Sequence, residues 1–442
     1  MRHYTTRKKS MFLLLMVFFL FACTSCSNGQ PHAKQVKLPE EEDGLTIWAW
    51  DEAFNITAAK AAKEIYEREH PDSVIRVVTV AQDDIVAKLN TAFASGVFDE
   101  LPDIVLIEDY RIPWYLHHYS EKFANLSDIA DADDFAPYKT EMNQMGGDMY
   151  GIPFDCGVAA LFYRTDYIEQ AGYSRKDMEN LTWDKYIEIG KAVKEKTGKY
   201  MLSLNPGDLG QIRMMLQSAG SWYTDENGRQ NIVGNGVLRE AILTYKKMVD
   251  AGIAVHIADW NQFVGAFNSG EVASVPTGCW VSPSLQKAAD QAGKWAVAEI
   301  PRMKGVKASV NASSLGGGGW YVLKDAGHEE EAKNFLKETF ASNVELMDRL
   351  VEEIHLVSTL KAASKTQNYR EGVAFFGGQK IFEDFAEWVE EVPTVNYGED
   401  TYEIETRMEE AFQKIMDGVD MDVVLEGTFA AAETADKGVG EQ

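Results

Sequence analysis

From residue 45 onward, short apolar stretches rich in β-branched residues alternate with amphipathic stretches, and this alternation constrains the fold more than any other feature. It predicts three strands at residues 45–50, 74–80 and 103–107, with helices at 54–69 and 83–95 between them. Pro71 and Gly96 follow the two helices, where such residues commonly end a helix. A βαβαβ order predicts an open, mostly parallel sheet. Ligands of such sheets bind beyond the carboxyl ends of the strands. Position alone therefore makes Asp51, Glu108 and Asp109 candidate ligand-binding residues.

A second unit of the same α/β character follows a strand expected at residues 150–155. Further strands are expected at 159–163, 200–204, 272–276, 295–301 and 317–323, and helices at 183–196, 211–218, 238–250 and 260–268. From residue 329 the pattern is mainly helical, with Glu and Lys on faces typical of solvated helices. The length of 442 residues fits two or three domains.

The composition excludes several classes of protein. With 45% hydrophobic and 25% charged residues the chain is globular, neither wholly disordered nor a polytopic membrane protein. Its net charge of −26 repels phosphate backbones, so we expect no nucleic-acid partner. Four cysteines are too few for a disulfide framework, and no C-x-x-C pair is accompanied by a second cluster that could complete a zinc site. Whether Cys156 and Cys279 pair is left open.

The N-terminus differs from the rest of the chain. Basic residues precede an apolar run at residues 11–22, which is too short to span a bilayer but suits a secretory signal peptide covering residues 1–22. The run ends in Leu20-Phe21-Ala22-Cys23, which resembles a bacterial lipobox and predicts lipidation of Cys23. Cys26 is the alternative lipidation site, and an ordinary cleaved signal is the alternative to lipidation. Residues 23–43 are then a flexible, lipidated tether to the outer face of the cell membrane.

No short catalytic or nucleotide-binding motif occurs. The sequence lacks phosphate-loop, dinucleotide-binding, nucleophile-elbow and H-E-x-x-H patterns, and we assign no metal ligand and no cofactor. The acidic cluster at residues 128–134 lacks the Gly and terminal Glu of a calcium loop, and favours a solvated loop. The Gly316–Gly319 run opens a strand rather than a helix, so it indicates close backbone packing or approach to a ligand.

Aromatic and acidic residues at strand ends suggest carbohydrate recognition. A sugar ring stacks its C–H face on an indole, and carboxylates or guanidinium groups bind its hydroxyls. Tryptophans occur at loop or strand-end positions, and Trp48 is assigned to the core because it alternates with Trp50. The tryptophans at such positions are Trp50, Trp222, Trp260, Trp280 and Trp320, and all of them except Trp260 are taken as binding candidates. The charged candidates beside them are Asp51, Asp109, Asp155, Asp208 and Arg213.

Several segments, in order, resemble the extracellular solute-binding proteins of bacterial ABC sugar importers, the group that includes maltose-binding protein. Within it the likeness is to lactose, arabinose and arabino-oligosaccharide binding proteins. The segments are IWAWD (47–51), LPDIVLIEDY (101–110), YGIPFD (150–155), LFYRTD (161–166), TW (182–183), SAGSWY (218–223) and, more loosely, GGGGW (316–320).

The resemblance implies a two-lobed clamp of the type II periplasmic-binding-protein kind, each lobe a mostly parallel sheet flanked by helices. Lobe 1 would hold residues 44–152 and 301–342, lobe 2 would hold 153–300 and 343–435, and the hinge would lie near 152–155 and 298–301. A sugar or oligosaccharide would bind between the lobes and pass to the membrane permease. We expect a non-catalytic monomer. Trp50, Asp51, Asp109, Asp155, Trp222, Trp280 and Trp320 would face the cleft by family pattern, and Asp208 and Arg213 by position.

Two alternatives remain at this point. Cleft carboxylates beside Trp would also serve a lipid-anchored glycoside hydrolase. A binding protein for another solute, such as a polyamine, a peptide or iron, would share the fold. The sequence does not identify the sugar.

Overall fold

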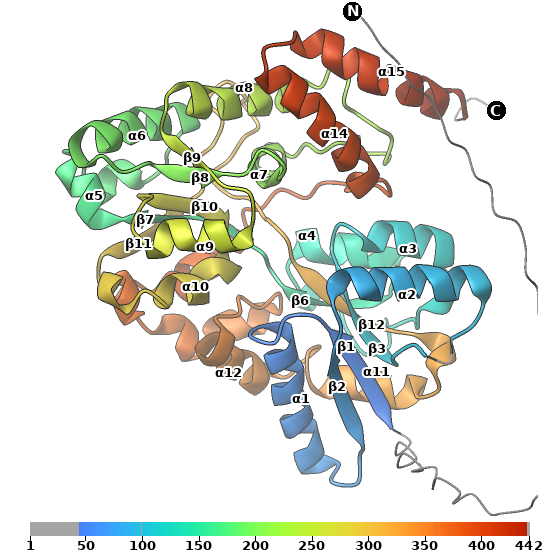
Figure 1. Ribbon diagram of the computed structural model, residues 1–442. Helices are drawn as coiled ribbons and strands as arrows, with labels where there is room; N and C mark the ends of the chain where they lie inside the picture. The colour runs from blue at the N-terminus through green and yellow to red at the C-terminus, as the bar shows by residue number, and fades with distance from the viewer. Residues whose placement is uncertain (1–43, 99, 440–442) are drawn as a thin grey trace, which may run out of the picture. The chain divides into compact units, whose positions relative to one another are not determined.

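Five strands form a mixed sheet in the order β2-β1-β3-β12-β6 in the computed structural model, which describes residues 44–98 and 100–439 (Figure 1). β1 pairs in parallel with both β2 and β3, as the βαβαβ pattern predicts. The strands are β1 (Leu45–Ala49), β2 (Ile75–Thr79), β3 (Ile104–Glu108), β6 (Gly151–Asp155) and β12 (Gly318–Val322), and the connecting helices are α1 (Asn55–Glu69) and α2 (Gln82–Ser95).

A second sheet has the order β10-β7-β11, and both of its pairings are antiparallel. The expectation of a mostly parallel second sheet is therefore corrected: parallel pairing there occurs in a separate two-stranded sheet, β8-β9, and in isolated bridges such as Tyr200–Val272. Apolar patterns predict that a strand forms, but carry no information on the direction of its partners. The strands are β7 (Ala159–Arg164), β8 (Leu202–Leu204), β9 (Ala254–His256), β10 (Ser274–Gly278) and β11 (Trp295–Glu299).

The helices begin and end close to where the sequence signals lie. The Thr182 hydroxyl accepts a hydrogen bond from the Lys185 amide and caps α6 (Trp183–Thr197), which is followed by Gly198 in the left-handed conformation. The other helices longer than one turn are α3 (Ile112–Tyr119), α5 (Thr165–Gln170), α7 (Gly210–Ser218), α8 (Gly236–Asp250), α9 (Trp260–Asn268), α10 (Ser282–Gln286), α11 (Glu329–Glu338), α12 (Val344–Ile354), α13 (Ile381–Val389), α14 (Thr401–Met416) and α15 (Met421–Val439). Two short strands, β4 (Gln144–Met145) and β5 (Asp148–Met149), and the one-turn helix α4 (Pro137–Thr140) precede β6.

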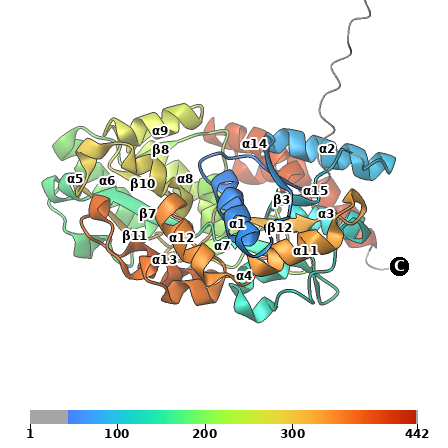
Figure 2. The same cartoon turned by 90° about the horizontal axis from the view of Figure 1, so that it is seen from below.

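Helices surround both sheets. Seen from below (Figure 2), β7, β10 and β11 lie with α5, α6 and α9 at one end, and β3 and β12 lie with α2, α3 and α11 at the other. α12 packs against α1, where Arg349 pairs with Glu64 at 2.8 Å. α14 packs with α8 and α6 in a core cluster that includes Tyr245 and Phe412. Cys156 and Cys279 are buried, free thiols. Across the described residues, no helix combines the length and apolarity needed to cross a bilayer.

The returning strand β12 organises one edge of the first sheet. It runs antiparallel between β3 and β6, with Gly318 opposite both Glu108 and Asp155. The carboxyl ends of β1, β3 and β6 therefore meet the start of β12 at the same edge. This is the edge at which the topology rule predicts a ligand.

Candidate functional site: a cleft between the two sheets

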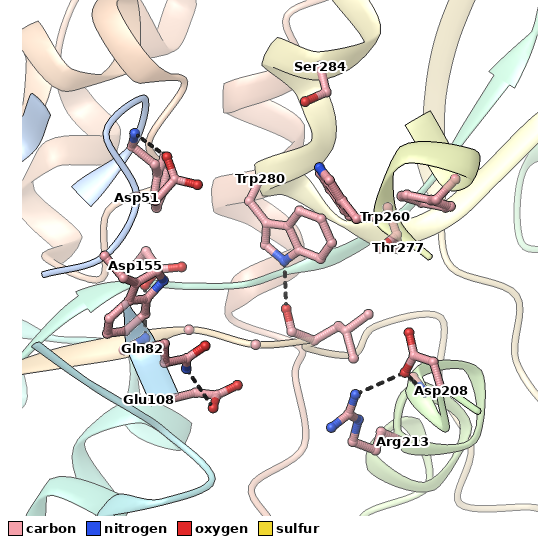
Figure 3. Close-up of a pocket in the computed structure, with 18 of the residues that line it drawn as sticks. Asp51, Gln82, Glu108, Asp155, Asp208, Arg213, Trp260, Thr277, Trp280 and Ser284 are labelled. Atoms are coloured by element: carbon pink, nitrogen blue, oxygen red, sulfur yellow. Dashed lines mark hydrogen bonds and ion pairs between the residues drawn. The ribbon is translucent and has the colours of Figure 1, made fainter. Parts of the chain in front are cut away.

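A cleft of about 760 Å³ opens at that edge and is lined by residues from both sheets (Figure 3). Its size falls within the roughly 300–1,000 Å³ typical of small-molecule sites. Six of the nine residues predicted from sequence line it, namely Trp50, Asp51, Asp155, Asp208, Arg213 and Trp280. The structure thus brings together side chains that lie up to 230 residues apart in the chain.

Trp50 and Asp51 come directly after β1. One Asp51 carboxylate oxygen accepts hydrogen bonds from the amides of Ala53 and Phe54, at 2.8 and 3.0 Å. The amides of Trp50 and Asp51 donate to the Asn55 side-chain oxygen, at 3.1 and 2.9 Å. These bonds fix the turn between β1 and α1. The Asp51 side chain itself is exposed to the cleft, where its second oxygen faces solvent space (Figure 3).

Asp155 ends β6 and is buried against the start of β12. Its Oδ1 accepts a hydrogen bond from the Gly318 amide at 2.9 Å. Burial raises the pKa of Asp155, and the positive charge of Lys139 opposes that rise. A carboxylate has about four acceptor positions, so Asp155 keeps capacity to accept hydroxyl donors from a ligand.

The start of β12 requires glycine because neighbouring side chains lie close to its backbone. Gly317 has φ of +115°, and a Cβ there would collide with Lys139 Nζ and Asp109 Oδ2. Gly316, Gly317 and Gly318 all line the cleft. Close packing and approach to the ligand space, the two roles suggested by the sequence, therefore occur together.

Trp280 and Trp260 form an aromatic wall on the other side of the cleft (Figure 3). Trp280 lies just after β10, and its indole Nε1 donates to the Leu315 carbonyl at 2.9 Å, which fixes the ring. Gly278 leaves room for this ring, since a Cβ there would collide with it. Trp260 opens α9 and its ring centroid lies 5.8 Å from that of Trp280, at an interplanar angle of 42°. Trp260 is 51% exposed, unusually high for an indole.

Asp208 and Arg213 pair at the remaining side of the cleft. Asp208 Oδ1 accepts from Arg213 Nη2 at 3.3 Å and from the Gly210 amide at 2.8 Å. Arg213 Nη1 also donates to Glu405 at 3.1 Å, and its guanidinium lies 5.2 Å from the centroid of the Tyr110 ring. The arginine is thus held by two carboxylates and an aromatic face, in an orientation suited to binding a hydroxyl.

Asp109 lies beneath the cleft instead of lining it, which corrects the expectation for this residue. Its carboxylate is 1% exposed and forms an ion pair with the fully buried Lys139. Burial raises the pKa of Asp109 to about 7, against the lowering effect of Lys139. The preceding residue Glu108 lines the cleft in its place and accepts from Gln82 Nε2 at 3.1 Å and from the Tyr402 hydroxyl.

Trp222 and Trp320 are also placed outside the cleft, in the hydrophobic core. Trp222 stacks on Tyr110, with ring centroids 5.5 Å apart, and donates to the Thr401 hydroxyl at 3.0 Å. Trp320 is fully buried and stacks on Phe340 at 4.9 Å. Both indoles are surrounded by other aromatic rings, so a ligand in the described cleft has no access to them.

Sequence reasoning did not select some polar and aromatic residues that line the cleft: Gln82, Glu108, Gln211, Asp259, Trp260, Thr277, Ser284 and Lys287. The sequence held a signal for two of them: Glu108 lies at the carboxyl end of a predicted strand, and Trp260 has the indole side chain on which sugars stack. The lining contains no His or Cys among the described residues and does not offer the ligands that soft metals prefer. Indoles beside carboxylates and amides instead suit a neutral ligand with apolar faces and many hydroxyls.

Comparison with known proteins identifies the family. The model of the bacterial extracellular solute-binding proteins matches residues 61–377. The lactose-binding protein of Rhizobium radiobacter is 43% identical over 86% of this chain and 90% of its own length. The arabinooligosaccharide-binding protein of Bacillus subtilis (strain 168) is 26% identical over 74% of each chain.

The fold agrees with a solved structure of the same kind. The ABC transporter associated binding protein from B. animalis subsp. lactis Bl-04, in complex with beta-1,6-galactobiose, superposes with a TM-score of 0.72 at 23% identity, covering 90% of this chain and 98% of that one. This chain therefore belongs to the family of bacterial extracellular solute-binding proteins, with the two-lobed type II fold. Membership of this extracellular family indicates that the protein is exported, and the two matching relatives are binding proteins by name.

Proposed function

We propose that the cleft captures a disaccharide or short oligosaccharide and presents it to the membrane permease. The observation that carries this proposal is the tilted pair of the exposed Trp260 and the half-buried Trp280, opposite Asp51 and Asp155. Sugar rings stack on indoles, and their hydroxyls donate to carboxylates. The names of the two relatives make lactose and arabino-oligosaccharides the first ligands to test.

The charges of the lining support a neutral ligand. Carboxylates outnumber the two basic residues, Arg213 and Lys287, so an anion such as a sugar phosphate would be repelled. A polyamine would suit the carboxylates, but Arg213 and Lys287 would oppose it. A neutral sugar can use both signs, because each hydroxyl is both donor and acceptor.

A thermal-shift panel tests the proposal, because a tight ligand raises the melting temperature by mass action. We expect a rise with lactose, a galactobiose or an arabino-oligosaccharide, and none with spermidine, a dipeptide or iron citrate. A rise with spermidine alone, or none with any saccharide of one to four units, would contradict the sugar assignment.

We further propose that the cleft binds without cleaving its ligand. Asp155 and Glu108 already hold part of their acceptor capacity within the protein, Asp155 with the Gly318 amide and Glu108 with Tyr402 and Gln82. A hydrolase needs one carboxyl group free to protonate the leaving oxygen and a second to attack or to activate water. Chromatography after prolonged incubation with the bound oligosaccharide should recover it intact. Released monosaccharide that disappears in Asp155→Asn would establish the hydrolase instead.

The division into lobes is part of the proposal. Lobe 1 is built on the β2-β1-β3-β12-β6 sheet and lobe 2 on the β10-β7-β11 sheet, with hinges near residues 152–155 and 298–301. Residues 343–435 were assigned to lobe 2, but the Arg349–Glu64 pair between α12 and α1 favours placing α12 with lobe 1. Ligand contacts with both lobes would favour closure.

Lipid anchoring through Cys23, with Cys26 as the alternative, and a monomeric state complete the proposal. Both cysteines and the signal peptide lie outside the described residues. Expression in the native host with radiolabelled palmitate should label the membrane-bound protein, and Cys23→Ala should release it unlabelled. Label retained in Cys23→Ala but lost in Cys26→Ala would move the site to Cys26.

A further inference from the structure

Two histidines and one glutamate meet on the surface, away from the cleft lining. His117 and His118 lie in the last turn of α3, and Glu399 lies 281 residues later, just before α14. His117 Nδ1 is 2.9 Å from one Glu399 carboxylate oxygen, and His118 Nε2 is 3.3 Å from the other. Both imidazoles therefore point at the same carboxylate, which comes from a distant part of the sequence.

We propose that His117, His118 and Glu399 form a binding site for a divalent transition-metal ion of the Zn²⁺ type. Imidazole nitrogen and carboxylate oxygen are ligands that Zn²⁺, Cu²⁺ and Ni²⁺ accept. One ligand atom from each residue lies within 4.8 Å of the other two. Zinc bonds of about 2.0–2.2 Å in a tetrahedral arrangement place ligand atoms about 3.3–3.5 Å apart, so small side-chain rotations suffice.

The surroundings of the three residues hold the rings in place and favour a cation. The His118 ring packs 4.9 Å from Trp114, and the two imidazoles contact each other edge to face at 4.9 Å. Glu399 also lines a groove of about 190 Å³ whose other acidic residues are Asp400 and Glu403, with Arg111 as its basic residue. The Arg111 charge is offset by Glu108, 3.5 Å away.

The three side chains are accessible to an ion from solution. Their exposed fractions are 58% for His117, 44% for His118 and 37% for Glu399, which leaves room for water at the remaining coordination positions. The ion would tie α3, which follows β3 of the first sheet, to the segment that leads into α14, whose side chains pack in the second unit's core. It would therefore brace a contact between distant parts of the chain.

Zinc titration calorimetry on the purified protein, prepared without a polyhistidine tag, tests the site. We expect one site, whose affinity falls in His117→Gln, His118→Gln and Glu399→Gln by at least the roughly 10- to 100-fold that loss of an outer-shell partner costs, because each variant removes a ligand. His70→Gln is the matched control, since His70 forms an exposed pair with Glu338 at 2.7 Å but belongs to no three-ligand cluster among the described residues. Its zinc affinity should equal that of the wild type.

Electron paramagnetic resonance of bound Cu²⁺ gives a second readout. The wild type should show hyperfine coupling to two imidazole nitrogens, and His118→Gln to one. Equal zinc affinity in the wild type and the three variants, or the absence of any binding heat, would overturn the proposal. Circular dichroism verifies folding of these surface variants. Sugar binding is titrated separately, so a failure of the sugar proposal would leave the zinc result intact.

Discussion

Replacing Trp280 by alanine should weaken sugar binding while leaving the fold intact. Trp280 is half-buried, its Nε1 is held by the Leu315 carbonyl and its ring lines the cleft beside Trp260. A buried Trp covers roughly 200 Å², and a stacked sugar ring would occupy about one third of that, or about 70 Å². At about 25 cal/mol per Å² the loss is about 1.7 kcal/mol, equivalent to about 15- to 20-fold in Kd.

The assay is titration calorimetry with the saccharide that gives the largest thermal shift. Trp388→Ala is the matched control, because Trp388 is also half-buried but lies on α13, outside the cleft lining. Trp280→Phe should lose less affinity than Trp280→Ala, since it keeps an aromatic face. An unchanged Kd in Trp280→Ala, or equal losses in Trp280→Ala and Trp388→Ala, would refute stacking on this residue.

Three further substitutions test the placement of buried residues. Trp222→Ala should lower the free energy of unfolding by about 3–5 kcal/mol in urea titrations, because it removes a core indole. A change below about 1 kcal/mol would indicate that Trp222 lies at the surface of the cleft and not in the core. Lys139→Met should cost about 3–5 kcal/mol at pH 8 by leaving Asp109 without its partner, and an unaltered urea midpoint would argue against the buried pair. Burial lowers the pKa of His355 to about 4, so the unfolded chain takes up its proton first and stability should fall by on the order of 1–3 kcal/mol as the pH drops from 6.5 to 4. His355→Asn, which suits the left-handed backbone at this position, should lessen that fall, and an identical pH profile would contradict the assignment.

The rule that ligands bind beyond the carboxyl ends of parallel strands located the cleft, because the strands themselves can be predicted from local patterns. Residues 45–49 and 104–108 form strands where the apolar runs lie, and Trp50, Asp51 and Glu108 follow or end them at one edge. The rule could not choose between Glu108 and Asp109. That choice depends on Lys139, thirty residues later, which takes Asp109 into a buried ion pair.

The predictions that Trp222 and Trp320 face the cleft were wrong for related reasons. Every residue of β12 is buried, so no alternation of apolar and polar residues indicated which way Trp320 points. Trp222 is flanked by Gly and Ser, as a binding residue in a loop would be, but Tyr110 and Thr401 from distant segments enclose it. Trp260 was not predicted as a binding residue, because only the folded position of α9 exposes its ring to the cleft.

A crystal structure of the protein with its preferred saccharide would show directly whether the sugar binds in the cleft. We predict a sugar ring stacked on the Trp280 and Trp260 wall, with hydroxyls within hydrogen-bond distance of Asp155 and of Asp51 or Arg213. A saccharide bound elsewhere on the surface, or one in the cleft that touches neither indole, would contradict it.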